Sequence, residues 1–318
     1  MINFSYPQPR QLSQADASMM IDHFVEHIEL SSEPALIITT SRSGEERAVA
    51  TSVGQFLVDL QPMYDFAIST DGHAVSEKLR VFREACQDVG IEFSPLVGIT
   101  CLDESESRYL SEVETFNWLV DRIRERACGK RYLRERYDCR YRTEKNQVAV
   151  FNYAKAVLEK RSRTVIVRID FSYLGGALVD VQVKQLFEDL RRFMLQRRSS
   201  SIFKHEVGHT YLVGQDVDKG YFIRTIFFFD GTYVKSDWNK ARSIGGFWRR
   251  VTQGRGGYVS SNHDMSRYWG ELGVGVFDHP DERAIVNIAH AIRRLSGFAE
   301  PLRIKPVGAR CFHLGAVR

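Results

Sequence analysis

Histidine and glutamate side chains occur close together in the segment H-E-V-G-H at residues 205–209. These residue types bind zinc and transfer protons. A helical H-E-x-x-H motif places both imidazoles on one face, but this segment has the composition of a strand. On a strand, His205 and His209 share a face about 13 Å apart, with Glu206 on the opposite face. We therefore expect structural histidines here and no metal site.

A second polar group, His263, Asp264 and Tyr268, lies in the segment that begins S-S-N-H-D at residue 260. A histidine, a carboxylate and a tyrosine can together form an activated nucleophile. Because closeness in sequence is weak support for such geometry, we treat this group only as an alternative site.

One charged residue, Arg224, interrupts the apolar segment K-G-Y-F-I-R-T-I-F-F-F-D-G at residues 219–231. Turn residues bound the segment, and its aromatic and β-branched content predicts a central strand buried on both faces. An arginine keeps its charge, and burying it without a partner costs several kcal/mol or more. Arg224 must therefore pair with a carboxylate, for which Asp170 and Asp216 are candidates, or face water or an anionic ligand.

Strands and helices alternate around this central strand. A short turn-rich segment separates it from a strand at 203–213, which predicts an antiparallel hairpin. The order strand, helix, hairpin, helix, strand, helix indicates an antiparallel sheet with helices packed on it. The other predicted elements are a strand at 164–173 and helices at 180–198, 236–253 and 281–295. Trp238 and Trp248 are among the apolar residues of the helix at 236–253.

The N-terminal half is predicted to be mainly helical. Apolar residues recur at helical spacing in 16–30, 74–89 and 105–127, and extended segments are predicted at 35–38 and 90–101. A chain of 318 residues, 43% hydrophobic and 26% charged, can bury two modest cores. We therefore predict an α+β protein with two domains, residues 1–145 and 146–318.

The segment that joins the two predicted domains is basic. Ten lysine and arginine residues between positions 122 and 145, Arg131 and Arg134 among them, are interleaved with Tyr132, Tyr137 and Tyr141. Such a pattern suits phosphate contacts combined with stacking on bases. The alternative is a solvated helix face, because carboxylates recur three or four residues from many of these cations.

Motifs along residues 160–315 resemble the inovirus replication-protein family that includes the YagK/YfjJ C-terminal domains. The matching segments are G-Y at 220–221, F-D-G at 229–231, V-I-V-R-I-D at 165–170, F-x-H-x-V-G at 203–208, and the segments 252–258, 267–275 and 302–310. That family is similar to HUH-type rolling-circle initiators. The resemblance implies an HUH-type antiparallel sheet with packed helices in the C-terminal domain.

The resemblance also implies a metal-dependent site, whose positions hold other residues in this chain. The two strand histidines of the family correspond to Phe222 and Arg224, and its acidic metal ligand corresponds to Gly214. Its nucleophilic tyrosine falls near Arg294, and its lysine near Gly297. These residues offer a metal no lone pair and a phosphate no nucleophile. We therefore expect no metal, no cofactor and no nicking activity.

DNA binding is the function that the resemblance implies once catalysis is lost. Arg224 and Arg294 could bind phosphate where the metal ion would lie, and the glycine-rich segment at 254–257 could approach the DNA backbone. The predicted DNA contacts are Arg224, Arg242, Arg249, Arg250, Arg255, Arg267, Arg294, Arg131 and Arg134. The expected role is that of a regulatory or replication-accessory protein of a prophage or mobile element, with phage or host proteins as further partners.

Two alternatives remain open. One is an active metal-dependent nicking or strand-transfer enzyme with relocated catalytic residues, for which His263 and Tyr268 are the candidates. The other is a protein-interaction module that uses the former DNA surface.

Composition agrees with a cytoplasmic protein. The net charge is +4 and the isoelectric point is near 8.7, which favours weak attraction to polyanions. The N-terminal residues lack the pattern of a signal peptide, and no apolar run is long enough to cross a membrane. The five cysteines never form C-x-x-C, which favours reduced thiols and no zinc finger.

Overall fold

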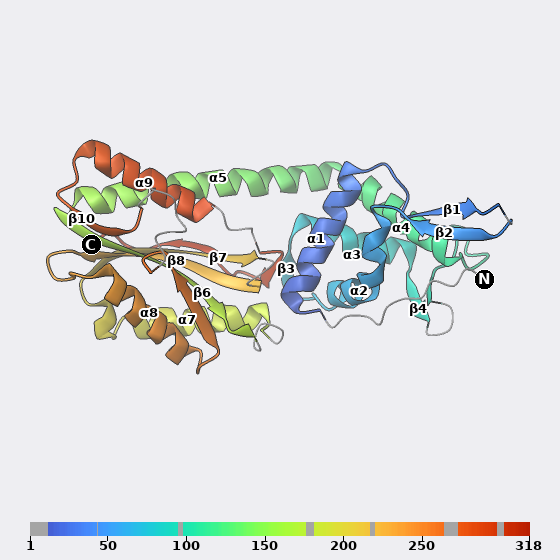
Figure 1. Cartoon of the computed structure of the whole chain (residues 1–318). Coiled ribbons are helices and arrows are strands. Elements are labelled where there is room, and N and C mark those ends of the chain that lie inside the picture. The colour runs from blue at the N-terminus through green and yellow to red at the C-terminus, as the bar shows by residue number, and fades with distance from the viewer. Residues whose placement is uncertain are drawn as a thin grey trace. The chain divides into compact units, whose positions relative to one another are not determined.

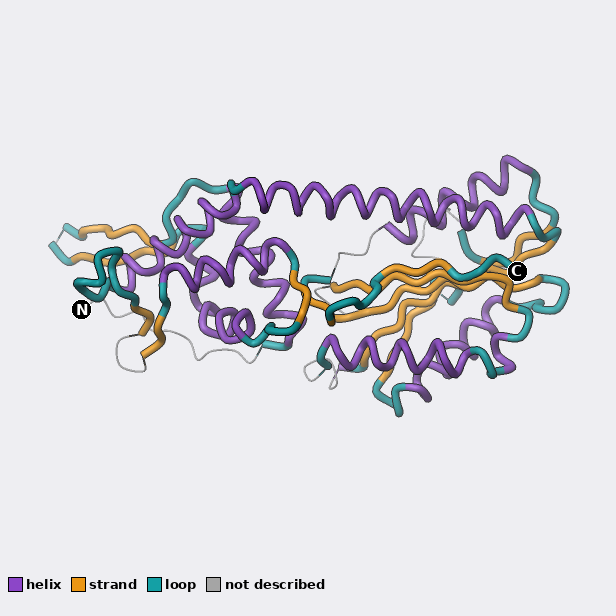
Figure 2. Tube along the Cα trace, turned by 180° about the vertical axis from the view of Figure 1, so that it is seen from behind, coloured by secondary structure: helices purple, strands orange, loops and turns teal. Residues whose placement is uncertain are grey.

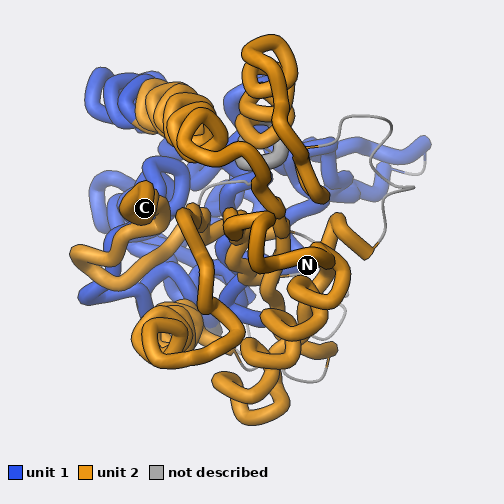
Figure 3. The backbone as a smooth tube through the Cα atoms, turned by 90° about the vertical axis from the view of Figure 1, so that its left-hand side faces the viewer, with its two compact units in different colours: residues 1–138 blue, residues 139–318 orange. Residues whose placement is uncertain are grey.

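The chain divides into two compact units, Met1–Asp138 and Cys139–Arg318 (Figure 3). The computed structural model describes residues 12–42, 44–94, 98–175, 181–216, 220–263, 273–297 and 302–318. The division lies within the long helix α5 (Lys130–Glu159), as does the boundary predicted after residue 145. A boundary within a helix has no loop or proline to mark it in the sequence.

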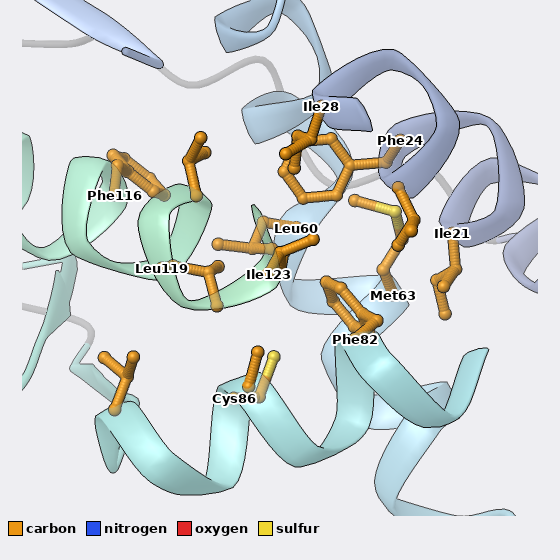
Figure 4. Packing of buried hydrophobic residues seen from close by; sticks show 14 of the residues in the cluster. Ile21, Phe24, Ile28, Leu60, Met63, Phe82, Cys86, Phe116, Leu119 and Ile123 are labelled. Atoms are coloured by element: carbon orange, nitrogen blue, oxygen red, sulfur yellow. The ribbon is translucent and has the colours of Figure 1, made fainter. Parts of the chain in front are cut away.

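Unit 1 is mainly helical, as the sequence predicts. Its helices α1 (Gln14–Leu30), α2 (Leu60–Ile68), α3 (Glu77–Val89) and α4 (Glu112–Ala127) surround a core of aliphatic and aromatic side chains (Figure 4). Phe24, Phe82 and Ile123 are fully buried there. The other elements are the 3-10 helix η1 (Gly54–Asp59), the strand β3 (His73–Val75), and the antiparallel pairs β1 (Leu36–Thr40) with β2 (Glu46–Ala50) and β4 (Glu92–Ser94) with β5 (Gly98–Thr100).

The helix expected at 105–127 begins seven residues later than predicted, at Glu112. Ser111 caps the helix, because its hydroxyl accepts the N–H of Glu114 while the Glu114 side chain bonds back to the Ser111 N–H. The preceding residues turn around Asp103, whose carboxylate accepts the Ser107 N–H at 2.8 Å. Local capping therefore outweighs the helical periodicity of residues 105–111.

Unit 2 contains an antiparallel six-stranded sheet, which confirms the predicted α+β class. The strand order is β10-β6-β8-β7-β12, and β9 and β10 pair with different parts of β6. The strands are β6 (Arg163–Tyr173), β7 (Glu206–Asp216), β8 (Gly220–Asp230), β9 (Gly256–Ser260), β10 (Gly275–Asp278) and β12 (Phe312–Leu314), and β11 (Ile304–Pro306) lies outside this sheet. The segment containing Arg224 is thus a central strand, and it forms the predicted hairpin with β7.

Helices cover both faces of this sheet (Figures 1 and 2). The C-terminal part of α5 and the helix α9 (Glu282–Gly297) pack aliphatic residues on one face, against Ile166, Ile226 and Phe228. The helices α7 (Val183–Arg197) and α8 (Asp237–Val251) cover the other face, which is aromatic, and Phe171 stacks on Trp248 at 4.9 Å between ring centroids. Alternate residues of β6 and β8 therefore enter two chemically different layers.

Some strands and helices begin at other residues than predicted, because caps and turns occupy the predicted start. The strand expected from residue 203 begins at Glu206, since the 3-10 helix η2 (Ser201–Phe203) occupies its start. α9 begins where predicted, with the Asp281 carboxylate accepting the Ala284 N–H at 2.7 Å. Among the described helices, none is long and apolar enough to cross a bilayer.

Candidate nucleic-acid interface

Arg224 lies on β8 directly opposite Asp170 of β6 and is 9% exposed. Its Nε and Nη2 atoms each donate to a different oxygen of the Asp170 carboxylate, both at 3.1 Å. This two-point contact uses the planar fork of the guanidinium, which matches a carboxylate as well as a phosphate. Arg224 is thus paired with a carboxylate. The partner is Asp170, one of the two candidates that the sequence offered.

A second arginine shares the same carboxylate. Arg168, two residues before Asp170 on β6, donates from Nη2 to Asp170 at 3.2 Å and from Nη1 to Ser261 at 2.5 Å. We call Arg168, Asp170 and Arg224 the buried ion cluster. Each member is less than one-tenth exposed, so removal of the shared carboxylate would leave charge in a poorly solvated layer.

Three of the five residues that the resemblance aligns with catalytic positions lie together on the sheet. Gly214 of β7 pairs with Phe222 of β8, and Arg224 follows two residues later on the same face. The Arg224 guanidinium lies 5.2 Å from the centre of the Phe222 ring. The other two positions, Arg294 and Gly297, belong to α9, which packs over this face, and the Arg294 side chain is outside the described residues. Within the described ranges, no cluster of histidine, cysteine or carboxylate side chains is arranged to hold a metal ion.

The outer face of α8 carries exposed cations. Arg242 and Arg249 are seven residues apart and share one side of the helix, and Arg250 adjoins them. Among the residues that the structure describes, none of the three side chains forms an ion pair or a hydrogen bond. The single carboxylate of α8, Asp237, accepts from Asn262 at 2.8 Å. We call these three arginines the α8 basic face.

Trp238 extends the α8 basic face by one turn. The sequence counted this tryptophan among the apolar residues of its helix, but its side chain is 46% exposed. The Arg242 guanidinium lies 5.9 Å from the centre of the Trp238 ring, one turn away. Its spacing of four residues from Arg242 is a signal that could have placed it on the outer face. An exposed indole beside cations can stack on an unpaired base.

Arg255 has a different environment from the α8 cations. Its Nη2 lies 3.7 Å from the fully buried carboxylate of Asp189, and its Nε donates to the carbonyl of Thr252 at 3.3 Å. Asp189 also accepts from the Tyr173 hydroxyl at 2.9 Å. Burial, with the nearby Asp189 charge, raises the pKa of Tyr173. Arg255, just before β9, therefore helps to neutralise the buried Asp189 carboxylate of α7. Its own side chain remains partly exposed. Arg267 lies outside the described residues.

The basic segment of α5 is partly paired with carboxylates. Arg131 contacts Glu135 at 3.2 Å and Glu84 at 3.5 Å. Arg134 is exposed and forms no ion pair with another described residue. The three tyrosines of this segment differ in exposure. Tyr132 is buried, whereas Tyr137 and Tyr141 are more than half exposed. Some residues of the segment thus fit a nucleic-acid contact, and others fit a solvated helix face paired with carboxylates.

The predicted placement of Glu206 is wrong. Glu206 and His209 lie on one face of β7, with Nδ1 of the imidazole 2.8 Å from the carboxylate. The ladder with β8 pairs Glu206 with Phe229 but Gly208 with Phe228, so one extra residue enters β7 at this point. Such a bulge reverses the alternation of side chains. His205 precedes the strand and stacks on Tyr233 at 4.1 Å.

The alternative catalytic group is described only in part. Nε2 of His263 lies 3.0 Å from the Trp238 carbonyl, and its ring packs 4.6 Å from the Trp238 ring. Asp264 and Tyr268 lie outside the described residues. His263 thus lies against the first turn of α8.

The predicted DNA contacts therefore fall into three places. Arg224 and α9, with Arg294, belong to one side of the sheet. The α8 basic face belongs to the other, as does Arg255 through its contact with Asp189 of α7, while Arg131 and Arg134 belong to unit 1. Comparison with known proteins found no matching family model, no matching curated protein and no matching solved structure.

Proposed function

We propose that this protein is a catalytically inactive relative of rolling-circle replication initiators. In this proposal it binds hairpin or single-stranded, origin-like DNA as a regulatory or accessory protein of a prophage or related mobile element. The observation that carries DNA binding is the α8 basic face, where Arg242, Arg249 and Arg250 are exposed without carboxylate partners in the described chain. Unpaired surface cations attract a polyanion and release its counterions on contact.

Single-stranded or hairpin DNA is favoured over plain duplex by Trp238. Its half-exposed ring adjoins Arg242, so a phosphate and an unstacked base could be contacted by neighbouring turns of one helix. A base within a duplex has both faces covered by its neighbours and offers no such surface.

The loss of catalysis is supported by the side chains at the family's metal positions. Phe222 and Gly214 carry no metal-binding atom, and the Arg224 fork is directed at Asp170. Metal-assisted cleavage of a phosphodiester needs a held divalent ion and a nucleophile in line with the bond.

Binding is tested by gel shift with a duplex, a hairpin and a single strand of matched sequence, each over a range of salt concentrations. We expect retention of the hairpin and the single strand, with affinity that falls steeply as salt rises. A response that is flat with salt, or no retention of any DNA, would contradict the proposal.

Catalysis is tested separately with the same substrates in magnesium or manganese. We expect no nicked product from the wild-type protein. Metal-dependent cleavage that disappears in Tyr268→Phe and His263→Ala would instead support the enzyme with relocated residues. Retention of a protein partner in place of any DNA would support the interaction module.

A further inference from the structure

A pocket of about 950 Å³ lies between the end of α7, η2, the start of β7 and the residues that follow β12. Its volume is within the usual range for small-molecule sites. The cations Arg197, Arg198, Lys204 and Arg318 line it, and Glu206 is the single acidic side chain among the described lining residues. We call it the His209 pocket, after the buried imidazole in its wall.

The Glu206 charge is already compensated inside the pocket. Arg197 forms an ion pair with this carboxylate, and His209 Nδ1 lies 2.8 Å from the same carboxylate and 3.2 Å from Nη1 of Arg197. Arg198 and Lys204 are exposed, and neither forms an ion pair with any other residue that the structure describes. The pocket therefore has an excess of positive charge that the described protein groups do not neutralise.

His209, which lines the pocket, has a buried polar atom without a partner among the described residues. The residue is 7% exposed, and its Nε2 has no hydrogen-bond partner within the described part of the chain. A buried polar atom without a partner costs free energy unless a ligand or water satisfies it. Because Glu206 holds Nδ1, the ring cannot turn Nε2 away without breaking that bond.

The backbone around His209 is shaped to keep this imidazole in place. The β7 bulge brings Glu206 and His209 to one face, and the His209 N–H donates to the Tyr153 hydroxyl at 3.0 Å. Gly208 makes room for that hydroxyl, since a Cβ there would lie 2.6 Å from the Tyr153 oxygen. A Cβ on Gly315 would collide with the His209 ring. Two glycines thus permit the packing that fixes the ring.

We infer that the His209 pocket binds a phosphomonoester, with Arg198 and Lys204 contacting its oxygens and a protonated Nε2 of His209 donating a hydrogen bond at the inner end. A doubly charged phosphate fits the excess of cations better than a carboxylate with one charge. This site is distinct from the α8 basic face, so it goes beyond the proposed function.

The wall of the pocket could also hold a base attached to the phosphate. Tyr211 stacks on His313 with 5.2 Å between ring centroids, and His313 lies 5.5 Å from His209. Burial, together with the charges of His209, Arg197 and Arg310, lowers the pKa of His313, so this ring is neutral near pH 7. A bound dianion opposes these positive charges and is expected to raise the pKa of His313.

The test is an NMR titration of the histidine resonances in the full chain with three probes: inorganic phosphate, deoxyadenosine monophosphate, and a single strand with or without a 5′-phosphate. We expect saturable shifts of the His209 and His313 signals and a higher pKa of His313 in the bound form. A response to all three phosphates indicates recognition of the phosphoryl group alone. A response only to the nucleotide and the 5′-phosphorylated strand indicates that the base contributes.

Variants separate the pocket from general basicity. Arg198→Gln/Lys204→Gln removes two exposed cations and should weaken phosphate binding about tenfold or more for each cation removed. Arg191→Gln/Lys184→Gln, on exposed α7 positions outside the pocket, removes the same charge and should leave the affinity unchanged. His209→Asn keeps a donor toward Glu206 but lacks Nε2, and it should also weaken binding. Absence of saturable shifts in the wild-type protein, or equally weakened binding in the two double variants, would overturn the inference.

Discussion

Two groups of arginines on opposite sides of one sheet have opposite surroundings. Arg168 and Arg224 are buried beneath α5 and α9 and share the carboxylate of Asp170. Arg249 and Arg250 are exposed on α8 and form no ion pair among the described residues. The guanidinium group is the same in both, so its role depends on solvent access and on whether a carboxylate reaches it first. The comparison teaches that arginine content alone does not identify a nucleic-acid surface.

The strongest way to break this comparison is to remove the shared carboxylate. Asp170→Ala should lower the free energy of unfolding by roughly 3–5 kcal/mol, because two buried guanidinium groups would lose the carboxylate that they share. Urea denaturation followed by circular dichroism measures this change.

The matched control removes a carboxylate from an exposed pair. Glu144→Ala breaks the ion pair of 3.7 Å with Arg140 and should cost less than about 0.5 kcal/mol. Equal effects of the two variants would show that the buried ion cluster is not structural.

The second prediction concerns the exposed group. Arg249→Glu/Arg250→Glu should weaken binding of hairpin or single-stranded DNA about a hundredfold, because two attractive contacts become repulsive. The free energy of unfolding should change by less than about 1 kcal/mol, since both side chains are on the solvent side of α8. Gel shift and urea denaturation give the two values.

Net charge is controlled with Arg42→Glu/Arg47→Glu, two exposed arginines of unit 1. This pair changes the charge of the chain by the same amount. If it reduced DNA affinity as much as the α8 reversal, the effect would come from total charge and the α8 basic face would have no special role.

A third prediction sharpens the α8 side through the salt dependence. If Arg242 contacts one phosphate, Arg242→Gln should reduce the slope of log affinity against log salt by about 0.7 for a single strand. Affinity measured by fluorescence anisotropy at several salt concentrations gives the slope. An unchanged slope with reduced affinity would point to a role in positioning Trp238 instead.

The smallest effect is expected in unit 1. Arg131 is 68% exposed and pairs with Glu84 and Glu135, so Arg131→Gln should change DNA affinity and stability by less than about 0.5 kcal/mol each. Arg134→Gln is the informative partner variant, because Arg134 has no ion pair within the described chain. A clear decrease of affinity in Arg134→Gln alone would add α5 to the DNA-binding surface.

The sequence was sufficient where one strong local signal acted. The apolar run that only Arg224 and Thr225 interrupt predicted a central strand, and its flanking turn residues predicted the hairpin with β7. The need for a partner followed from the permanent charge of arginine. The choice of Asp170 over Asp216 did not follow, because it depends on the register between β6 and β8.

The sequence was insufficient where one residue changes the geometry. The bulge near Val207 places Glu206 beside His209, whereas strict alternation separates them. Gly208, an isolated glycine inside the predicted strand, is a local signal that could have indicated the bulge. The His209 pocket was also missed, because its walls come from α7, β7 and the residues after β12, which lie far apart in the chain.

Local sequence features specify the types of element and the chemistry available to them. Apolar periodicity and turn residues act over a few neighbours, so they specify an α+β chain with a buried central strand. Only the tertiary structure decided which arginines are neutralised, which stay exposed and where Glu206 lies. Those outcomes depend on strand register and on the burial of each side chain, which arise when segments distant in sequence pack together.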